Sequence, residues 1–163
     1  MGTKQGSLEL LNDPVAQEML QAPFPMRLSY VWMDGTPRAV PIGFHWDGTD
    51  LVIGSPPDAP KLKALRANPK VALTIDSNQM PYHVLLIRGT AAMTTHDGII
   101  PEYAAYCHRY MGQEGGDAWL QQVDMLIKTM VRIAIRPEWA GIIDFETRMP
   151  SAVEHAIETL GGG

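Results

Sequence analysis

Prolines and glycines interrupt this chain along its whole length. It holds 13 prolines and 15 glycines, which together make up about one-sixth of its 163 residues. Proline lacks a backbone donor, and glycine loses more conformational freedom on folding than any other residue. Such frequent breaks favour short strands joined by turns and argue against a bundle of long helices.

The composition is that of a globular chain. Hydrophobic residues make up 45% and charged residues 19%, which is enough to bury a core and excludes intrinsic disorder. The net charge of −5 argues against nucleic acid as a partner. No apolar run approaches the ~20 residues of a membrane span, so we expect no membrane partner either.

Cysteine usage and the first residues bear on the compartment. Cys107 is the single cysteine, so the chain forms no internal disulfide. Residues 1–7 lack the apolar core of a signal peptide. We therefore expect a cytoplasmic protein with one domain over residues 1–163.

Helical patterns lie at both ends of the chain and in one insertion. In the N-terminal segment 1–23, Asp13 and Pro14 have the residue types of a helix start. Residues 97–128 predict inserted helices with a break at 112–116. The C-terminal tail, 146–163, contains a short helical stretch at 151–160.

Between these segments, alternating apolar residues and turn signals predict a mainly β fold with added helices. A barrel over residues 24–145 would be closed by six or seven short antiparallel strands. The strands are expected at 27–33, 38–46, 51–55, 70–76, 82–93, 129–136 and 139–145, with turns at 34–37, 47–50 and Pro137-Glu138.

Pro41 is unusual because it lies inside the strand predicted at 38–46. A proline cannot donate a hydrogen bond to a neighbouring strand, so it belongs at a sheet edge, at a bulge, or beside a ligand. Gly43 follows two residues later and would allow a ligand to approach the backbone closely. The two residues together are the first indication of a binding site.

The order of these elements has a familiar pattern. Residues 34–48 and 51–55 are followed by Lys61, Asn68-Pro69 and two further matches at 87–91 and 135–139. Over about residues 24–145 the chain resembles the pyridoxamine 5′-phosphate oxidase-like family of flavin-binding split barrels. The resemblance implies a six- to seven-stranded antiparallel split β-barrel. It also implies a homodimer that holds FMN in a groove between its subunits and transfers hydride to or from a small organic substrate.

The resemblance also implies which residues hold the cofactor. Ser55 and Lys61 match the positions that hold the phosphate, and His45 lies on a strand where the family has a ligand. The backbone of Val40, Pro41 and Ile42 would face the polar edge of the flavin ring. Independently of the resemblance, Lys61 lies just inside a predicted helix start, where the helix dipole favours an anion.

The chain departs from the oxidases themselves at the phosphate pocket. Val40 and His45 stand where the oxidases have arginine and lysine, and Ala59-Pro60 replaces a serine-arginine pair. The pocket is therefore poorer in positive charge. FMN is the expected cofactor, and a deazaflavin coenzyme is the alternative. A deazaflavin-dependent reductase, a non-catalytic cofactor-binding protein and a plain interaction domain remain open, and no catalytic residue is identified.

Other chemically capable residues are assigned ordinary roles. Tyr103, Tyr106 and Tyr110 form a helical stripe suited to core or dimer packing, and Trp139 is expected in the core or at the dimer groove. No metal site is expected, because metal-ligand spacing is absent from the histidines His45, His83, His96, His108 and His155.

Overall fold

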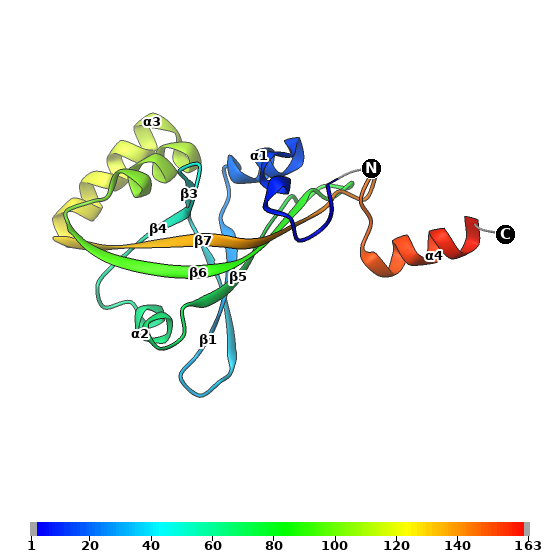
Figure 1. Ribbon diagram of the computed structural model, residues 1–163. Coiled ribbons are helices and arrows are strands. Elements are labelled where there is room, and N and C mark those ends of the chain that lie inside the picture. Colours follow the sequence, from blue (N-terminus) through cyan, green and yellow to red (C-terminus); the bar gives the residue numbers. More distant parts are fainter. Residues whose placement is uncertain (1–2, 162–163) are drawn as a thin grey trace.

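Seven strands form one antiparallel sheet in the computed structural model, which describes residues 3–161 (Figure 1). The order across the sheet is β2-β1-β5-β6-β7-β4-β3. The strands are β1 Met26–Val31, β2 Pro37–Ile42, β3 His45–Trp46, β4 Leu51–Ser55, β5 Lys70–Asp76, β6 Val84–Asp97 and β7 Thr129–Ile143. The prediction of a mainly β, seven-stranded antiparallel fold is confirmed.

The helices lie around this sheet. They are the 3-10 helix η1 Leu8–Asn12 and the α-helices α1 Pro14–Leu20, α2 Pro60–Ala67, α3 Pro101–Leu126 and α4 Ser151–Gly161. As predicted, Asp13 caps α1 by accepting a hydrogen bond from the Val15 amide at 2.9 Å. Residues 1–2 and 162–163 of the predicted terminal segments lie outside the described part.

The curvature of the sheet follows from one short connection. β2 and β3 lie at opposite edges of the sheet, yet only Gly43 and Phe44 separate them in the chain. Three residue steps span at most about 10 Å, so the sheet must curl until its edges nearly meet. The prediction of one strand over 38–46 is therefore wrong. Of the three positions predicted for Pro41, an edge, a bulge or a place beside a ligand, the structure shows the edge, because β2 is an edge strand.

Two packed clusters hold the barrel together. Along β4, Leu51 and Ile53 face the main core, whereas Val52 faces a smaller cluster beneath α3. Residues of α1 and α2, including Leu20 and Leu62, complete the main core. The alternation expected of a strand with both faces covered thus places α3 against the β3–β4 side.

Pro137-Glu138 does not form the predicted turn. β7 continues through it, and Pro137 lies opposite Gly89 where the register between β6 and β7 shifts. Such a bulge accommodates a residue that has no donor. A side chain at Gly89 would overlap the carbonyl of Arg136, so the close approach of the strands requires glycine.

The predicted break between two inserted helices is limited to one residue. Only Gly112 has non-helical dihedrals within α3, with φ 76°. Gly116 is buried against the backbone of His108, so the two halves of α3 meet across the kink. In the described part of the chain, no helix has the length and apolar character needed to cross a membrane.

A tightly bonded turn connects the barrel to α4. Asp144, which is 4% exposed, accepts hydrogen bonds from the amides of Glu146, Thr147 and Arg148 and from the Thr147 hydroxyl. Burial by itself would raise the pKa of Asp144, but these hydrogen bonds outweigh it and hold the pKa far below its usual range. The ionised carboxylate therefore organises this turn.

We expect Gly43→Ala to destabilise the protein by about 1–3 kcal/mol, because the new methyl group would overlap the ring of Tyr106. Urea denaturation measures the loss, with Gly161→Ala as the control, since no atom lies within 4 Å of the added carbon there. In a Tyr106→Ala background the same substitution should cost much less. An equal cost in both backgrounds would contradict the overlap.

Asp144→Asn should lower the free energy of unfolding at pH 7 by about 1–3 kcal/mol, because the amide replaces an ionised acceptor. The folded-state pKa of Asp144 is depressed, so its contribution is present above the unfolded pKa of about 4 and is lost as the pH falls below it. Wild type and variant should converge in acid, as followed by denaturation at several pH values. The exposed Asp124→Asn is the control, and a pH-independent difference would refute this account.

Candidate functional site

The start of α2 leaves a backbone donor free. The N-cap residue Ala59 makes no side-chain hydrogen bond, and Pro60 at the first helical position has no amide hydrogen. The Leu62 amide donates to the Ala59 carbonyl at 3.0 Å. Within residues 3–161 the Lys61 amide has no acceptor, so it is available to a ligand.

The Lys61 side chain adds a positive charge at the same place. It is half-buried, and burial lowers its pKa with no compensating carboxylate. Of the ion pairs formed among residues 3–161, none involves Lys61. Lys63 is exposed, as expected from its direction on the helix. Because a partly desolvated cation without a partner is unfavourable, the site suits an anion.

Ser55 lies at the end of β4, just before this helix. It is fully buried, pairs with Val131 of β7 and donates its hydroxyl hydrogen to the Pro56 carbonyl at 3.3 Å. The loop that covers it is exposed at Pro56 and Pro57. The hydroxyl is therefore near the start of α2 in the chain but enclosed, whereas Lys61 is partly open.

Val40, Pro41 and Ile42 lie on the edge strand β2. Val40 and Ile42 are half-buried against the main core, whereas Pro41 is exposed. β2 pairs only with β1 among the described residues, so its other side presents an unpaired backbone edge. The contact of these residues with a flat ligand that has a polar edge stays a prediction.

His45 lies on a different face of the sheet. It is opposite Val52, whose side chain lies beneath α3, so both side chains face α3. Its Nδ1 atom is 3.5 Å from Nη1 of Arg109. Burial lowers the pKa of His45, and the charge of Arg109 lowers it further, so the ring is neutral at pH 7. The structure thus separates His45 from the inward-facing Ser55.

The space at Gly43 is already occupied. A side chain there would overlap the ring of Tyr106, which α3 places against this connection. The prediction that Gly43 leaves room for a ligand is therefore wrong. Tyr103 of the same helix likewise packs on a glycine, since it and Met130 fill the corresponding space at Gly54.

Arg109 is a structural part of this region that no sequence pattern indicated. Its Nε donates to the Ala22 carbonyl at 3.1 Å, and its Nη2 donates to the Phe44 carbonyl. It therefore ties α3 to the connection between the two sheet edges. No short-range pattern marks it, because Phe44 is 65 residues away in the chain.

A second charged cluster lies beside His45. Arg132 on β7 is paired with Glu102 at 2.8 Å and with Asp47 at 3.3 Å. Glu102 is only 18% exposed and its Oε2 atom is buried without a partner in the described chain, so it is not a solvated surface charge. These pairs fix the start of α3 on the sheet. Within residues 3–161 there is no cluster of histidine, cysteine and carboxylate groups able to hold a metal ion.

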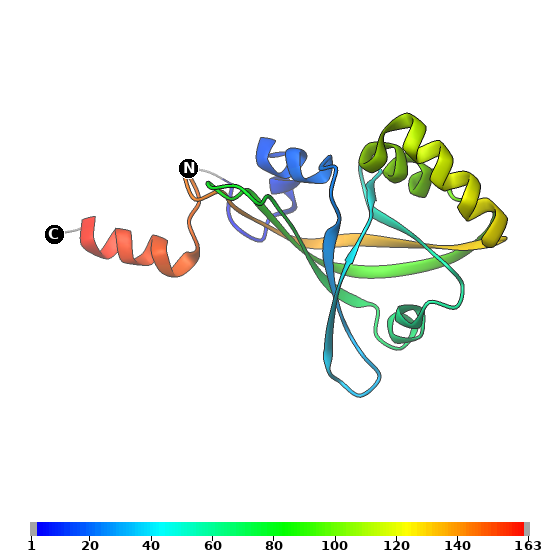
Figure 2. The same ribbon diagram turned by 180° about the vertical axis from the view of Figure 1, so that it is seen from behind.

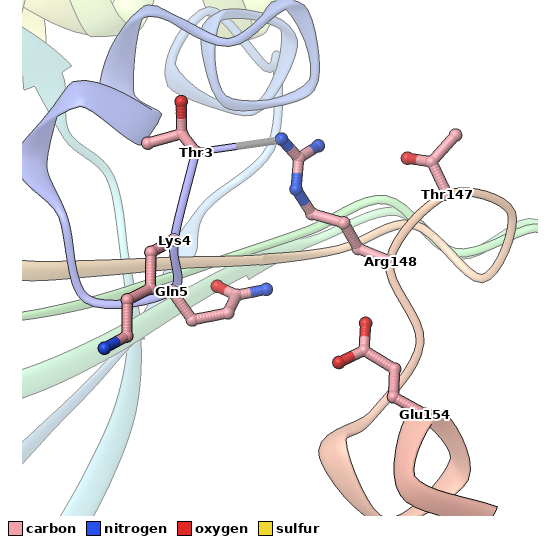
Figure 3. A pocket seen from close by; sticks show the side chains of 6 residues that line it. All are labelled: Thr3, Lys4, Gln5, Thr147, Arg148 and Glu154. Carbon is pink, nitrogen blue, oxygen red and sulfur yellow. The ribbon is translucent and has the colours of Figure 1, made fainter. Parts of the chain in front are cut away.

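A hollow of about 540 Å³ lies at the start of α4 (Figure 3). Figure 3 shows polar side chains from both ends of the chain around it. None of the predicted cofactor residues lines it. The lining residues are Thr3, Lys4, Gln5, Thr147, Arg148 and Glu154.

Comparison with known proteins establishes the family. A model of the pyridoxamine 5′-phosphate oxidase family matches residues 13–143. The chain belongs to this family. The match covers the barrel and begins at the cap of α1, upstream of the resemblance seen in the sequence. Among curated proteins, none matches the sequence.

Solved structures share the fold at low identity. An F420 reductase is 24% identical with a TM-score of 0.57, covering 77% of this chain and 94% of its own. A putative pyridoxamine 5′-phosphate oxidase from Listeria innocua is 23% identical with a TM-score of 0.56. The alignment covers 82% of this chain and 98% of the Listeria chain. An FAD-binding protein from Mesorhizobium loti is 19% identical with a TM-score of 0.51. The alignment covers 77% of this chain and 89% of the Mesorhizobium chain.

Arg109→Met should destabilise the protein by about 1–3 kcal/mol, because it leaves the carbonyls of Ala22 and Phe44 without their charged donor. Arg109→Lys should recover only part of the loss, since one ammonium cannot reproduce the fork of donors. Urea denaturation measures both. The exposed Arg66→Met on α2 is the control, and a loss equal to that control would show that Arg109 does not secure the connection.

Proposed function

We propose that the protein binds FMN with its phosphate at the start of α2 and acts as a flavin-dependent oxidoreductase on a small organic substrate. The observation that carries this proposal is Lys61, whose half-buried ammonium group and free amide have no partner among residues 3–161. A phosphate would neutralise the positive charge of the ammonium group and would accept hydrogen bonds from both the ammonium group and the amide. The dipole of the eight-residue helix α2 favours an anion at the same end.

The edge strand β2 supports the placement of the ring. A flavin ring carries donors and acceptors along one edge, and an unpaired strand edge offers both kinds of group. The half-buried Val40 and Ile42 would provide an apolar surface beside that edge. When bound, the flavin supplies the hydride chemistry, while the protein binds it, orients it and limits the access of water.

A deazaflavin coenzyme is the alternative cofactor. The F420 reductase that shares this fold supports it, as does the low positive charge around Lys61, with uncharged Ala59-Pro60 on its N-terminal side. A non-catalytic carrier of the same cofactor is a second alternative, since no side chain near Lys61 is assigned as an acid or base.

We further propose that the protein is a homodimer in the cytoplasm. The outer face of β2, β1, β5, β6 and the second half of β7 has no helix over it in the described chain (Figure 1). Exposed faces of antiparallel sheets are usually polar. This one presents small or apolar side chains, among them Ala39, Pro41, Ala72, Leu86, Trp139 and Ile143, between the charged side chains of Arg27, Lys70 and Arg88. Such a face suits a second copy of the chain.

Lys61→Ala should weaken FMN binding by about tenfold to a hundredfold, as expected for the loss of a charge-assisted hydrogen bond. Binding of riboflavin, which lacks the phosphate, should be unchanged. Lys63→Ala, two residues along the same helix, is the matched control. Fluorescence titration gives all six dissociation constants.

If Lys61→Ala leaves the FMN constant unchanged, the phosphate does not bind at α2. If it weakens FMN and riboflavin equally, Lys61 acts on the fold and not on the phosphate. Titration with a deazaflavin coenzyme distinguishes the two cofactors, because only the cofactor of this site should lose affinity on Lys61→Ala. A protein that binds neither contradicts the proposed function.

A further inference from the structure

The helix α4 exposes an apolar stripe to solvent. None of its residues is buried, and Val153, Ile157 and Leu160 are 44%, 56% and 84% exposed. Their spacing places them on one face of the helix. Glu154 and Glu158 lie along one side of this stripe, and α4 contains no lysine or arginine. An amphipathic helix of this kind normally covers its apolar face with another element.

The exposure of α4 is imposed by the turn that precedes it. Asp144 binds the turn as described above, and Arg148 forms an ion pair with Asp13 at 3.0 Å. Glu154 accepts a hydrogen bond from the Met149 amide at 3.1 Å, which fixes the first turn of the helix. Figures 1 and 2 show α4 directed away from the sheet in both views. These bonds hold the stripe away from the chain's own barrel.

A complementary surface lies on the outer sheet face. A hollow of about 260 Å³ is lined by Leu86, Trp139 and Ile143 of the sheet and by Met149 and Glu154 at the root of α4. The guanidinium of Arg88 lies 4.0 Å from the centre of the Trp139 ring. Arg88 has no carboxylate partner within the described residues. This surface therefore combines apolar side chains with an unneutralised positive charge.

The two surfaces match in character. The stripe on α4 is apolar with carboxylates beside it, and the β6–β7 part of the outer face is apolar with an arginine beside it. Ser151 and Glu154 at the root of α4 border this hollow in their own chain, whereas the rest of the helix points away from the sheet (Figure 1). The stripe is therefore placed to cover the matching surface of another molecule.

We propose that α4 of one copy packs its Val153–Ile157–Leu160 stripe on the β6–β7 part of the outer sheet face of a second copy. Two-fold symmetry makes the exchange mutual, so each chain donates one helix and receives one. The inference deepens the proposed homodimer and rests on it. It adds a specific element, the C-terminal helix, as the arm that joins the copies.

The first test changes the stripe in the full-length chain. Ile157→Glu with Leu160→Glu should raise the dissociation constant of the dimer at least about tenfold, because two apolar side chains lose their burial. The matched control, His155→Glu with Thr159→Glu, places the same charges on the opposite face of the helix and should leave the constant unchanged. Sedimentation equilibrium measures association, and circular dichroism checks that the barrel is folded.

The second test identifies the surface that α4 covers. A chain carrying Ile157→Cys is mixed with a differently tagged chain carrying Leu86→Cys and treated with a short bismaleimide. The native Cys107 is buried, so the introduced thiols should react preferentially. We expect a cross-link between the two differently tagged chains, and none when Leu86→Cys is replaced by the control Ala118→Cys on α3.

Each outcome decides the inference separately from the proposed function. An unchanged dimer constant for the stripe variant overturns the arm exchange and leaves the homodimer in place. A wild-type monomer overturns both. A monomeric chain carrying both cysteines that closes on itself shows that α4 covers its own sheet, which also overturns the exchange. Failure of FMN to bind a dimer that depends on α4 overturns the cofactor proposal alone.

Discussion

The two-residue connection between β2 and β3 is the constraint on which the rest of this structure depends. It joins the two edges of a seven-stranded sheet, so the sheet curls around the main core until its edges nearly meet at this connection. α3 secures the closure from outside. Arg109 binds the Phe44 carbonyl, and the ring of Tyr106 fills the space that a side chain at Gly43 would take. The long helical insertion therefore contributes directly to the closure of the barrel.

Closure also determines what the two faces of the sheet are used for. The inner face forms the core, and α3 covers the outside of β3 and β4, with Val52 in the smaller cluster. The outer face from β2 to the second half of β7 is left without a helix. Its small and apolar side chains and the exposed stripe of α4 are two surfaces of the described chain that lack a partner. The proposed dimer would cover both.

The candidate cofactor site depends on an uncompensated charge. Several other charged groups of the barrel are paired, as Arg132 is with Glu102 and Asp47. Lys61 stands out because burial lowers its pKa with no carboxylate nearby. Proline at the first position of α2 leaves the Lys61 amide as a free donor beside this charge. A single residue therefore offers both groups that a phosphate needs.

Local patterns predicted most of the elements of this fold. Alternation and turn residues located the strands, Asp13 and Pro14 marked the start of α1, and Pro41 indicated an edge, because these features depend on backbone chemistry within a few residues. The order of the motifs along the chain was enough to indicate the family and to identify Lys61 and Ser55 as candidates for binding a phosphate. The misassigned features involve contacts across the fold. The division of the strand 38–46, the passage of β7 through Pro137 and the filling of Gly43 by Tyr106 each require a partner far away in the chain.

The sequence by itself therefore determined the class of fold, the approximate elements and the residues with the right chemistry. Only the tertiary structure decided which of them meet. It placed His45 beneath α3, away from Ser55, and joined Arg109 to Phe44 across 65 residues. It also left Lys61 without a counter-ion and directed α4 into solvent. The physical reason is that burial and charge neutralisation depend on neighbours in space, which closure of the sheet selects and local sequence does not encode.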